Sequence, residues 1–248
     1  MIDSSVRVAL ESLAKAAGCR QQHRYTHFLD PAQAEEAGRI ARAYGLLFCA
    51  WGGFAQAERK IGCFLPPGEA VTESDYPICA LMARYDARFA TLTHRDVLGA
   101  TLALGLTRAV LGDIITESGR VFLFVEKSLA PFLEDGLREI GRTTLRFSFE
   151  PDPQALLPAP AGSYFRAVIP SLRLDAVLAA AYHLSRSRAG ELIRGGGVKV
   201  NYLPCLSVDK LLSADCMLSV RGLGRVRLAS MDGQTRKERL GVTFFKYE

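Results

Sequence analysis

The amino-acid sequence predicts an α+β protein built from several domains. Segments with the apolar spacing of amphipathic helices alternate with short runs rich in β-branched and aromatic residues, the pattern of mixed helix and strand folds. The chain has 248 residues, of which 49% are hydrophobic, so it can bury the cores of two or three domains. A proline-rich stretch at residues 151–162 reads as a semi-rigid linker between a nearly neutral body and a basic C-terminal part.

Residues 1–70 are expected to form a small N-terminal α+β domain. Residues 4–17 and 32–43 have helical patterns, and Asp30 with Pro31 is a favourable start signal for the second helix. The two predicted strands that follow are residues 46–51 and 58–65.

His23 and His27 lie four residues apart and could share a helix face as metal ligands. Zinc needs three or four ligands, and no nearby carboxylate or cysteine completes a set. We therefore expect a surface loop or a helix end at these histidines. No metal site and no cofactor is predicted.

Residues 76–150 predict a second domain with the element order βαββαβ, which ferredoxin-like folds and RNA-recognition motifs share. The predicted elements are a strand within residues 77–92, a helix at 93–104, strands at 112–116 and 121–125, a helix at 128–140 and a strand at 143–149. Phe122 and Phe124 lie on the third strand, where RNA-recognition motifs place base-stacking aromatics, and Arg120 precedes them. Because the full glycine-aromatic signature is absent, core packing is the favoured interpretation and base stacking the alternative.

His94, Arg95 and Asp96 repeat the tripeptide that begins a kinase catalytic loop. The other kinase motifs are absent. A plainer interpretation is local, because Thr93 and Asp96 occupy the N-cap and N3 positions of the predicted helix and can form a capping box.

The cysteines and the hydropathy of the chain indicate a cytoplasmic protein. The six cysteines are far apart and never form a Cys-x-x-Cys pair, which is typical of reduced core residues. No run of 18 apolar residues exists, so no membrane span is expected, and the N-terminal residues lack the apolar stretch of a signal peptide.

The net charge of +5 is concentrated in the C-terminal third. From Ser163 onward there are 14 Lys and Arg against 7 Asp and Glu, whereas the first 162 residues hold 17 basic and 19 acidic residues. This asymmetry is the expected electrostatic footprint of a module that binds a polyanion, attached to a neutral body.

Residues 171–201 predict two helices followed by a short strand. Ser171 is expected to cap the first helix and Ser185 the second, in which Arg186, Arg188 and Arg194 point outward. The inward residues of the two helices are expected to be Leu174, Val177, Leu178 and Ala181, and then Ala189, Leu192 and Ile193. Cations are mildly unfavourable in the first turn of a helix unless an anion occupies the site, so a phosphate is expected there.

The chain after residue 201 has a β-like pattern. Arg221, Arg225 and Arg227 are predicted to extend the basic surface, and Arg225 and Arg227 share a strand face because they lie two apart. The charged run at 236–239 is either a further phosphate contact or a solvated surface segment. The predicted strands are residues 205–208, 217–220 and 225–229, with 242–247 able to close a sheet.

The motifs Arg-Leu-Asp at 173–175, Ser-Arg-Ser-Arg at 185–188, Glu-Leu-Ile at 191–193 and Val-Lys-Val-Asn at 198–201 together resemble the S4-type (αL) RNA-binding domain. In that family, two helices and a glycine-ended turn form an L-shaped surface for folded RNA, so residues 163–248 are expected to be an S4-like domain. Gly190 departs from the family pattern and is expected to loosen its turn by about 1 kcal/mol. The RNA contacts that the resemblance implies are Arg173, Ser185, Arg186, Ser187, Arg188, Arg194, Lys199 and Asn201.

A wider resemblance covers most of the chain. The run at 92–114, together with Phe-Leu-Asp-Pro at 28–31, Ala-Glu-Arg-Lys at 57–60 and the S4-like domain, is similar to the bacterial YlmH family. The resemblance implies a cytosolic RNA-binding protein on the large ribosomal subunit that acts on stalled complexes retaining a peptidyl-tRNA, with a link to cell division in some bacteria.

The expected function is therefore non-catalytic binding of structured RNA, either rRNA or tRNA, with an oligomeric state that the sequence leaves open. One alternative is an RNA-modifying enzyme, because pseudouridine synthases use an Arg-Leu-Asp whose aspartate attacks the base. Here that tripeptide opens a helix of the S4-like domain and is followed by AVLAAAY, so no catalytic residue is assigned. The other alternative is an interaction scaffold linked to cell division, with the basic face on anionic lipid.

Overall fold

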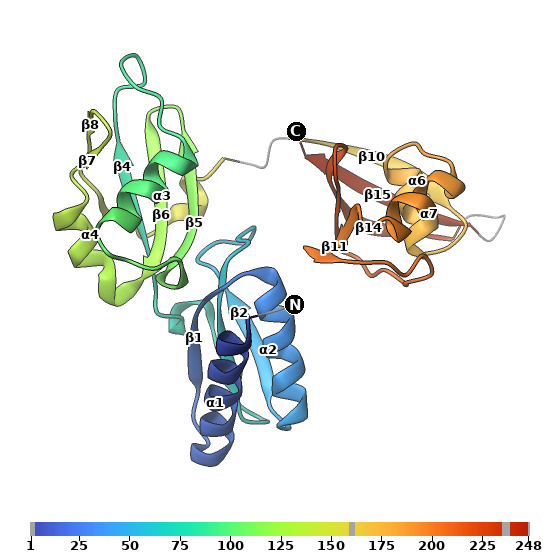
Figure 1. Ribbon diagram of the computed structural model, residues 1–248, viewed down its shortest axis with the longest axis horizontal. Helices are drawn as coiled ribbons and strands as arrows, with labels where there is room; N and C mark the ends of the chain where they lie inside the picture. Colours follow the sequence, from blue (N-terminus) through green and yellow to red (C-terminus); the bar gives the residue numbers. More distant parts are fainter. Residues whose placement is uncertain (1–2, 159–161, 235–238, 248) are drawn as a thin grey trace. The chain divides into compact units, whose positions relative to one another are not determined.

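The computed structural model describes residues 3–158, 162–234 and 239–247, and the chain divides into two compact units (Figure 1). Unit 1 is Met1–Leu157 and unit 2 is Pro158–Glu248. Each unit packs helices on antiparallel sheets, which confirms the predicted multidomain α+β fold class. Within the described ranges, no helix is long and apolar enough to cross a membrane.

The first part of unit 1 is a three-stranded antiparallel sheet with two helices on one face (Figure 1). The helices are α1 (Ser4–Arg20) and α2 (Pro31–Ala43), and the strands in spatial order are β1 (Arg24–Leu29), β3 (Lys60–Leu65) and β2 (Leu47–Trp51). Leu10 and Ile40 from the helices meet Phe64 of the sheet in one buried cluster. The predicted start of α2 is confirmed, because the Asp30 side chain accepts a hydrogen bond from the Gln33 backbone N–H at 2.8 Å.

Strand β1 corrects the expectation of a loop or helix end for His27, whereas His23 lies in the loop between α1 and β1 as expected. His27 lies inside β1, which pairs with β3 from Arg24 opposite Phe64 to Leu29 opposite Lys60. The spacing of the histidines pointed to a helical face. Pairing with a strand distant in the sequence determines the conformation instead.

The second part of unit 1 has the ferredoxin-like strand order that the sequence predicts. Its four-stranded antiparallel sheet runs β5-β6-β4-β9, so the third strand lies between the first and the second. The elements are η1 (Glu73–Asp75), β4 (Ile78–Arg84), α3 (His94–Ala103), η2 (Arg108–Val110), β5 (Leu111–Glu117), β6 (Arg120–Glu126), η3 (Lys127–Leu129), α4 (Ala130–Gly136) and β9 (Ser148–Phe149).

Two predicted elements of this part are shorter than expected. The helix expected at 128–140 ends at Gly136, and a small hairpin of β7 (Glu139–Ile140) and β8 (Thr143–Thr144) follows. The strand expected at 143–149 is therefore divided between β8 and β9. The capping box at the start of α3 is confirmed: Thr93 N–H donates to Asp96 Oδ2 at 2.9 Å, and Asp96 N–H donates to Thr93 Oγ1 at 3.4 Å.

Unit 2 is a six-stranded antiparallel sheet with two helices on one face (Figure 1). Its elements are β10 (Gly162–Ile169), α6 (Leu174–Ala181), α7 (Arg186–Arg194), β11 (Val198–Val200), β12 (Leu203–Pro204), β13 (Met217–Val220), β14 (Gly224–Gln234) and β15 (Leu240–Tyr247), in the spatial order β10-β15-β14-β13-β11-β12. The expected inward residues Leu174, Val177, Leu178, Ala181, Ala189 and Ile193 are all buried in one core, against which Leu192 packs.

Two local expectations for unit 2 are wrong, and one of its strands was not predicted. The first helix begins at Leu174 with Arg173 at its N-cap, so Ser171 does not cap it. Strand β10 was not predicted, and residues 205–208 form no strand. β10 lies at the sheet edge and pairs only with β15, which is more than seventy residues away in the chain, so its partner was not readable from local pattern.

The proline-rich stretch contains a short helix, α5 (Pro153–Leu156), that packs on unit 1. Leu156 and Leu157 contact the cluster formed by Phe54, Phe122 and Phe124. Residues 159–161 of the expected linker lie outside the described residues.

Candidate nucleic-acid interface

Asp175 organises the surface of α6 and α7. Asp175 Oδ1 accepts a hydrogen bond from Arg173 Nε at 3.2 Å, and Oδ2 accepts one from Arg186 Nη2 at 2.5 Å. The residue itself is only 9% exposed. Burial raises the pKa of Asp175, but the hydrogen bonds from Arg186 and Arg173 outweigh that effect and leave the pKa below its ordinary value. Two guanidinium groups from different helices are thus held side by side.

The N-terminus of α7 is capped as predicted. Ser185 Oγ accepts a hydrogen bond from the Arg188 backbone N–H at 3.1 Å. Ser187 and Arg188 are exposed in the first turn, and Arg188 Nη1 contacts Glu191 Oε2 at 2.8 Å. The first turn therefore presents hydroxyl and guanidinium groups to solvent, and its backbone N–H groups point along the helix axis.

Gly190 has a packing role that the sequence did not reveal. A β-carbon added at this position would meet Arg194 Nη1 and Nη2, each at 3.3 Å. The Arg194 guanidinium thus lies across the helix, over the glycine. The space left by the missing side chain is used to position a cation of the candidate surface.

The glycine-ended turn brings β11 back beside α7. Gly196 has a φ of 71°, and Gly197 N–H donates to the Leu192 carbonyl at 3.0 Å. Arg221 is exposed and its backbone N–H donates to the Gly197 carbonyl at 3.0 Å, which places it at this end of α7. Asn201 has a φ of 47° in the turn after β11, and its Oδ1 accepts from Met217 N–H at 2.8 Å, so its side chain also supports the fold.

The predicted site residues divide between the two faces of the unit 2 sheet. Val198 and Val200 face the helices, so Lys199 between them faces the opposite side. Val226 and Leu228 also face the helices, which places Arg225 and Arg227 on the same side as Lys199. The residues that the structure brings together on the helix side are Arg173, Ser185, Arg186, Ser187, Arg188 and Arg194. The expected contact at 236–238 lies outside the described residues.

The base-stacking alternative for Phe122 and Phe124 is overturned. Both side chains are 0% exposed, and Phe54 covers Phe124 with their ring centroids 4.7 Å apart. Leu156 and Leu157 add to the cover, so the favoured interpretation of core packing is confirmed. The covering groups are a loop that carries Phe54 and the short helix α5 with the residue that follows it.

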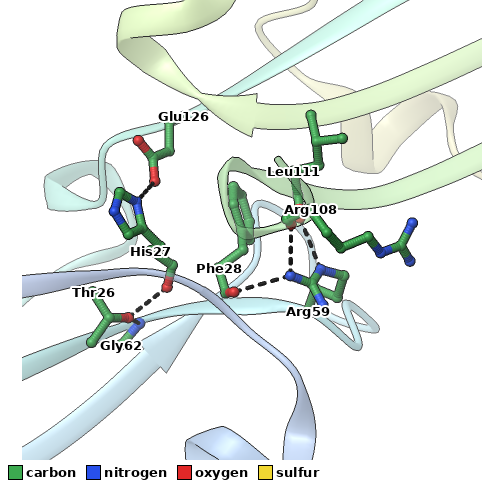
Figure 2. Close-up of polar contacts among 8 residues, drawn as sticks. All are labelled: Thr26, His27, Phe28, Arg59, Gly62, Arg108, Leu111 and Glu126. Atoms are coloured by element: carbon green, nitrogen blue, oxygen red, sulfur yellow. Dashed lines mark hydrogen bonds and ion pairs between the residues drawn. The ribbon is translucent and has the colours of Figure 1, made fainter. Parts of the chain in front are cut away.

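Arg59 joins the two parts of unit 1 through main-chain carbonyls (Figure 2). Its Nε donates to the Leu111 carbonyl at 2.8 Å, and its Nη2 donates to the carbonyls of Phe28 at 3.0 Å and Arg108 at 2.9 Å. Burial, with Arg108 nearby, lowers the pKa of Arg59. The Asp113 carboxylate accepts from the Arg59 backbone N–H at 3.2 Å, and burial raises its pKa.

The hydrogen bonds of Arg59 bring together residues from three separate sequence motifs. Phe28, Arg59 and the segment 108–113 belong to the three unit 1 motifs on which the wider resemblance rests. Sequence reasoning missed the contact, although Arg59 lies within one of the motifs that carry the wider resemblance. Beside it, His27 Nδ1 contacts Glu126 Oε1 at 2.5 Å (Figure 2), and no group of three potential metal-binding side chains occurs among the residues described.

Comparison with known proteins agrees with these features. Residues 71–151 match the family described as "Putative RNA-binding domain in YlmH", and residues 172–214 match the S4 domain. The chain is 32% identical over 219 residues to the ribosome-associated protein quality control protein P2 of Bacillus subtilis (strain 168), covering 88% of this chain and 85% of that protein.

Among solved structures, the chain is similar to the cell division protein ylmH from Streptococcus pneumoniae. The TM-score is 0.53 at 24% sequence identity, over 62% of this chain and 95% of the other, so this likeness shows a shared fold. The identity to the Bacillus subtilis protein extends over most of both chains, and the match at residues 71–151 is specific to one family. The chain belongs to the YlmH family.

Proposed function

We propose that the chain binds structured RNA, rRNA or tRNA, without catalysis, through the face formed by α6 and α7. The observation that carries the proposal is the pairing of Arg173 and Arg186 on Asp175 beside the N-terminus of α7. An arginine that is already oriented loses less side-chain entropy when it meets a phosphate. The N–H groups at the start of α7 that Ser185 does not cap add a second set of donors for the same anion.

Shape selects the RNA on this face, and phosphate contacts supply affinity. Arg188 and Arg194 lie six residues apart on α7, about one and two-thirds turns and about 9 Å along the axis, so they can contact phosphates at separate points of one folded RNA. Folded RNA is recognised mainly by shape and by phosphate contacts, because its deep major groove is closed to side chains. A rigid two-helix surface suits that task.

The burial and the ion pairs of Asp175 support RNA binding rather than catalysis. A pseudouridine synthase needs the aspartate of its Arg-Leu-Asp motif as a nucleophile, whereas Asp175 is 9% exposed and engaged by two guanidinium groups. Those contacts lower the nucleophilicity of the carboxylate and block its approach to a base.

The ribosome is the proposed location of this RNA. The Bacillus subtilis relative is named for ribosome association and quality control, and it matches this chain over both units. We infer that this chain acts on the large ribosomal subunit, on stalled complexes that retain a peptidyl-tRNA, and that it works in the cytoplasm.

The test is sedimentation of the full-length protein with ribosomes through sucrose gradients. Wild type is expected with large subunits, and a variant carrying Arg188→Glu and Arg194→Glu is expected at the top of the gradient. Arg186 is left intact because its loss would leave the buried Asp175 with one partner fewer.

A matched control removes the effect of net charge. Lys15→Glu with Arg20→Glu makes the same change in charge on exposed positions of α1 and should leave sedimentation unchanged. Co-sedimentation of the α7 variant at the wild-type level would contradict the proposal, because a surface other than the α6–α7 face would then carry the ribosome contact.

A further inference from the structure

The face of the unit 2 sheet opposite α6 and α7 carries aromatic rings and cations together. Because Val226, Leu228, Val242 and Phe244 face the helices, the residues that alternate with them face the other side. Among the described residues of unit 2, no helix covers that side. The residues of this open sheet face are Tyr164, Phe245, Tyr247, Arg225, Arg227 and Lys199.

Strand register places these side chains in continuous rows. Tyr164 is opposite Phe245, Phe245 opposite Arg227, and Arg227 opposite Met217. The four neighbouring strands β10, β15, β14 and β13 give a row about 14 Å long. RNA-recognition motifs stack two or three bases on a four-stranded sheet, so this row is long enough for the same task.

The rings contact one another in tilted and edge-to-face pairs, and arginines lie near two of them. The centroid of Phe245 is 4.8 Å from that of Tyr164 and 4.8 Å from that of Tyr247. The Arg227 guanidinium lies 5.9 Å from the Phe245 centroid, and that of Arg225 lies 5.8 Å from the Tyr247 centroid. Phe245 is 5% exposed while Tyr164 is 65% exposed, so a buried ring supports an open one.

The charge of the open sheet face favours an anionic ligand. Asp215 contacts Arg227 at 3.4 Å and Asp232 lies 3.9 Å from Arg166, while Arg225 and Lys199 add further positive charge at exposed positions. An apolar partner would leave these cations desolvated, and a carboxylate-rich peptide would make little use of the exposed ring. Unpaired nucleotides offer both phosphates and π-faces.

We propose that the open sheet face binds a single-stranded RNA segment, with bases stacked on Tyr164 and Tyr247 and phosphates near Arg225 and Lys199. The proposal goes beyond the α6–α7 face, since it assigns a second surface and a different RNA conformation. It rests on the proposed function only in that the same protein binds RNA.

The test uses the full-length protein and an oligouridine of about ten nucleotides with one 2-aminopurine, whose fluorescence falls when the base stacks on a ring. Wild type should quench the probe. Tyr164→Ala with Tyr247→Ala should weaken binding by at least about fivefold, the lower end for losing one base–ring stack. Tyr164→Phe with Tyr247→Phe keeps both rings and should bind as wild type, and Tyr44→Ala removes an exposed tyrosine of unit 1 as a control.

The outcomes separate this proposal from the proposed function. The Arg188→Glu, Arg194→Glu variant should lose ribosome sedimentation but still quench the probe. Wild type that sediments with ribosomes and does not quench would overturn the second surface alone. Quenching by wild type that does not sediment with ribosomes would overturn only the proposed ribosome location.

A second measurement avoids any question of variant folding. Photocrosslinking of a 4-thiouridine oligonucleotide to wild type should mark the peptides containing Tyr164 or Tyr247. Crosslinks confined to α7 peptides would overturn the proposal.

Discussion

Arg194 lies across Gly190, with two guanidinium nitrogens 3.3 Å from the place where a β-carbon would stand. Gly190→Ala is therefore expected to have opposite effects on stability and binding. Alanine should stabilise the helix by about 0.5–1 kcal/mol, since glycine is a poor helix former and the arginine tip can move aside. The displaced guanidinium should weaken binding of structured RNA severalfold.

Thermal melting and RNA titration together check this expectation. In an Arg194→Ala background, the glycine replacement should no longer affect RNA affinity. An equal loss of affinity in both backgrounds would show that Gly190 acts by another route.

Asp175→Asn should destabilise unit 2, because two arginines lose their charged partner. We expect a loss of about 1–3 kcal/mol in the free energy of unfolding at neutral pH. The folded-state pKa of Asp175 lies below its ordinary value near 3.8, so its contribution is present above that value and is lost as pH falls through the folded pKa. The difference between wild type and variant should thus shrink only at pH below about 4.

Urea unfolding followed by circular dichroism measures this difference. The single tryptophan, Trp51, lies in unit 1 and would report the wrong unit. A difference that stays constant down to about pH 2 would contradict the assigned ion pairs.

Arg59→Ala should destabilise unit 1 by about 3 kcal/mol, because the carbonyls of Phe28, Arg108 and Leu111 lose a shared donor. The transition is measured by Trp51 fluorescence in urea. Arg108→Ala is the matched control: its carbonyl takes part but its exposed side chain does not, so the change should be within about 0.5 kcal/mol. Equal effects of the two replacements would argue against the carbonyl contacts.

Phe54→Ala should uncover Phe124 and cost about 3 kcal/mol in unit 1, also followed through Trp51. The affinity for structured RNA should not change, because Phe54 is a cover and not a contact. If the variant binds RNA more weakly under conditions where it is fully folded, the four-stranded sheet of unit 1 does contact RNA.

Several helix caps could be predicted from the sequence. The cap at Ser185, the capping box of Thr93 and Asp96, and the start of α2 depend on residues within one helical turn, and each was predicted correctly. The βαββαβ order also followed from pattern, because its helices and strands alternate at regular intervals.

The pairing of strands that are distant in the sequence could not be predicted. Strands β1 and β10 pair with partners distant in the sequence, and although both segments are rich in aromatic and β-branched residues, neither was predicted as a strand. The same limit hid the separation of Arg186 from Arg225: both were predicted as parts of one basic surface, yet strand alternation places Arg225 on the opposite face of the sheet. Burial of Phe122 could be favoured from its neighbours, but the identity of its cover could not.

The ion pairs of Arg173 and Arg186 with Asp175 reduce the number of counterions that the α6–α7 face can displace from RNA. Arg173 and Arg186 divide one carboxylate, and Arg188 has Glu191 beside it, so the α6–α7 face carries a smaller net charge than its arginines suggest. Such a face displaces few counterions from RNA, and the logarithm of its affinity should fall with the logarithm of salt with a slope of only about −2. An RNA held there loses less affinity when ionic strength rises than one held by many unpaired cations, so fit to the two helices contributes more than charge to which RNA is retained.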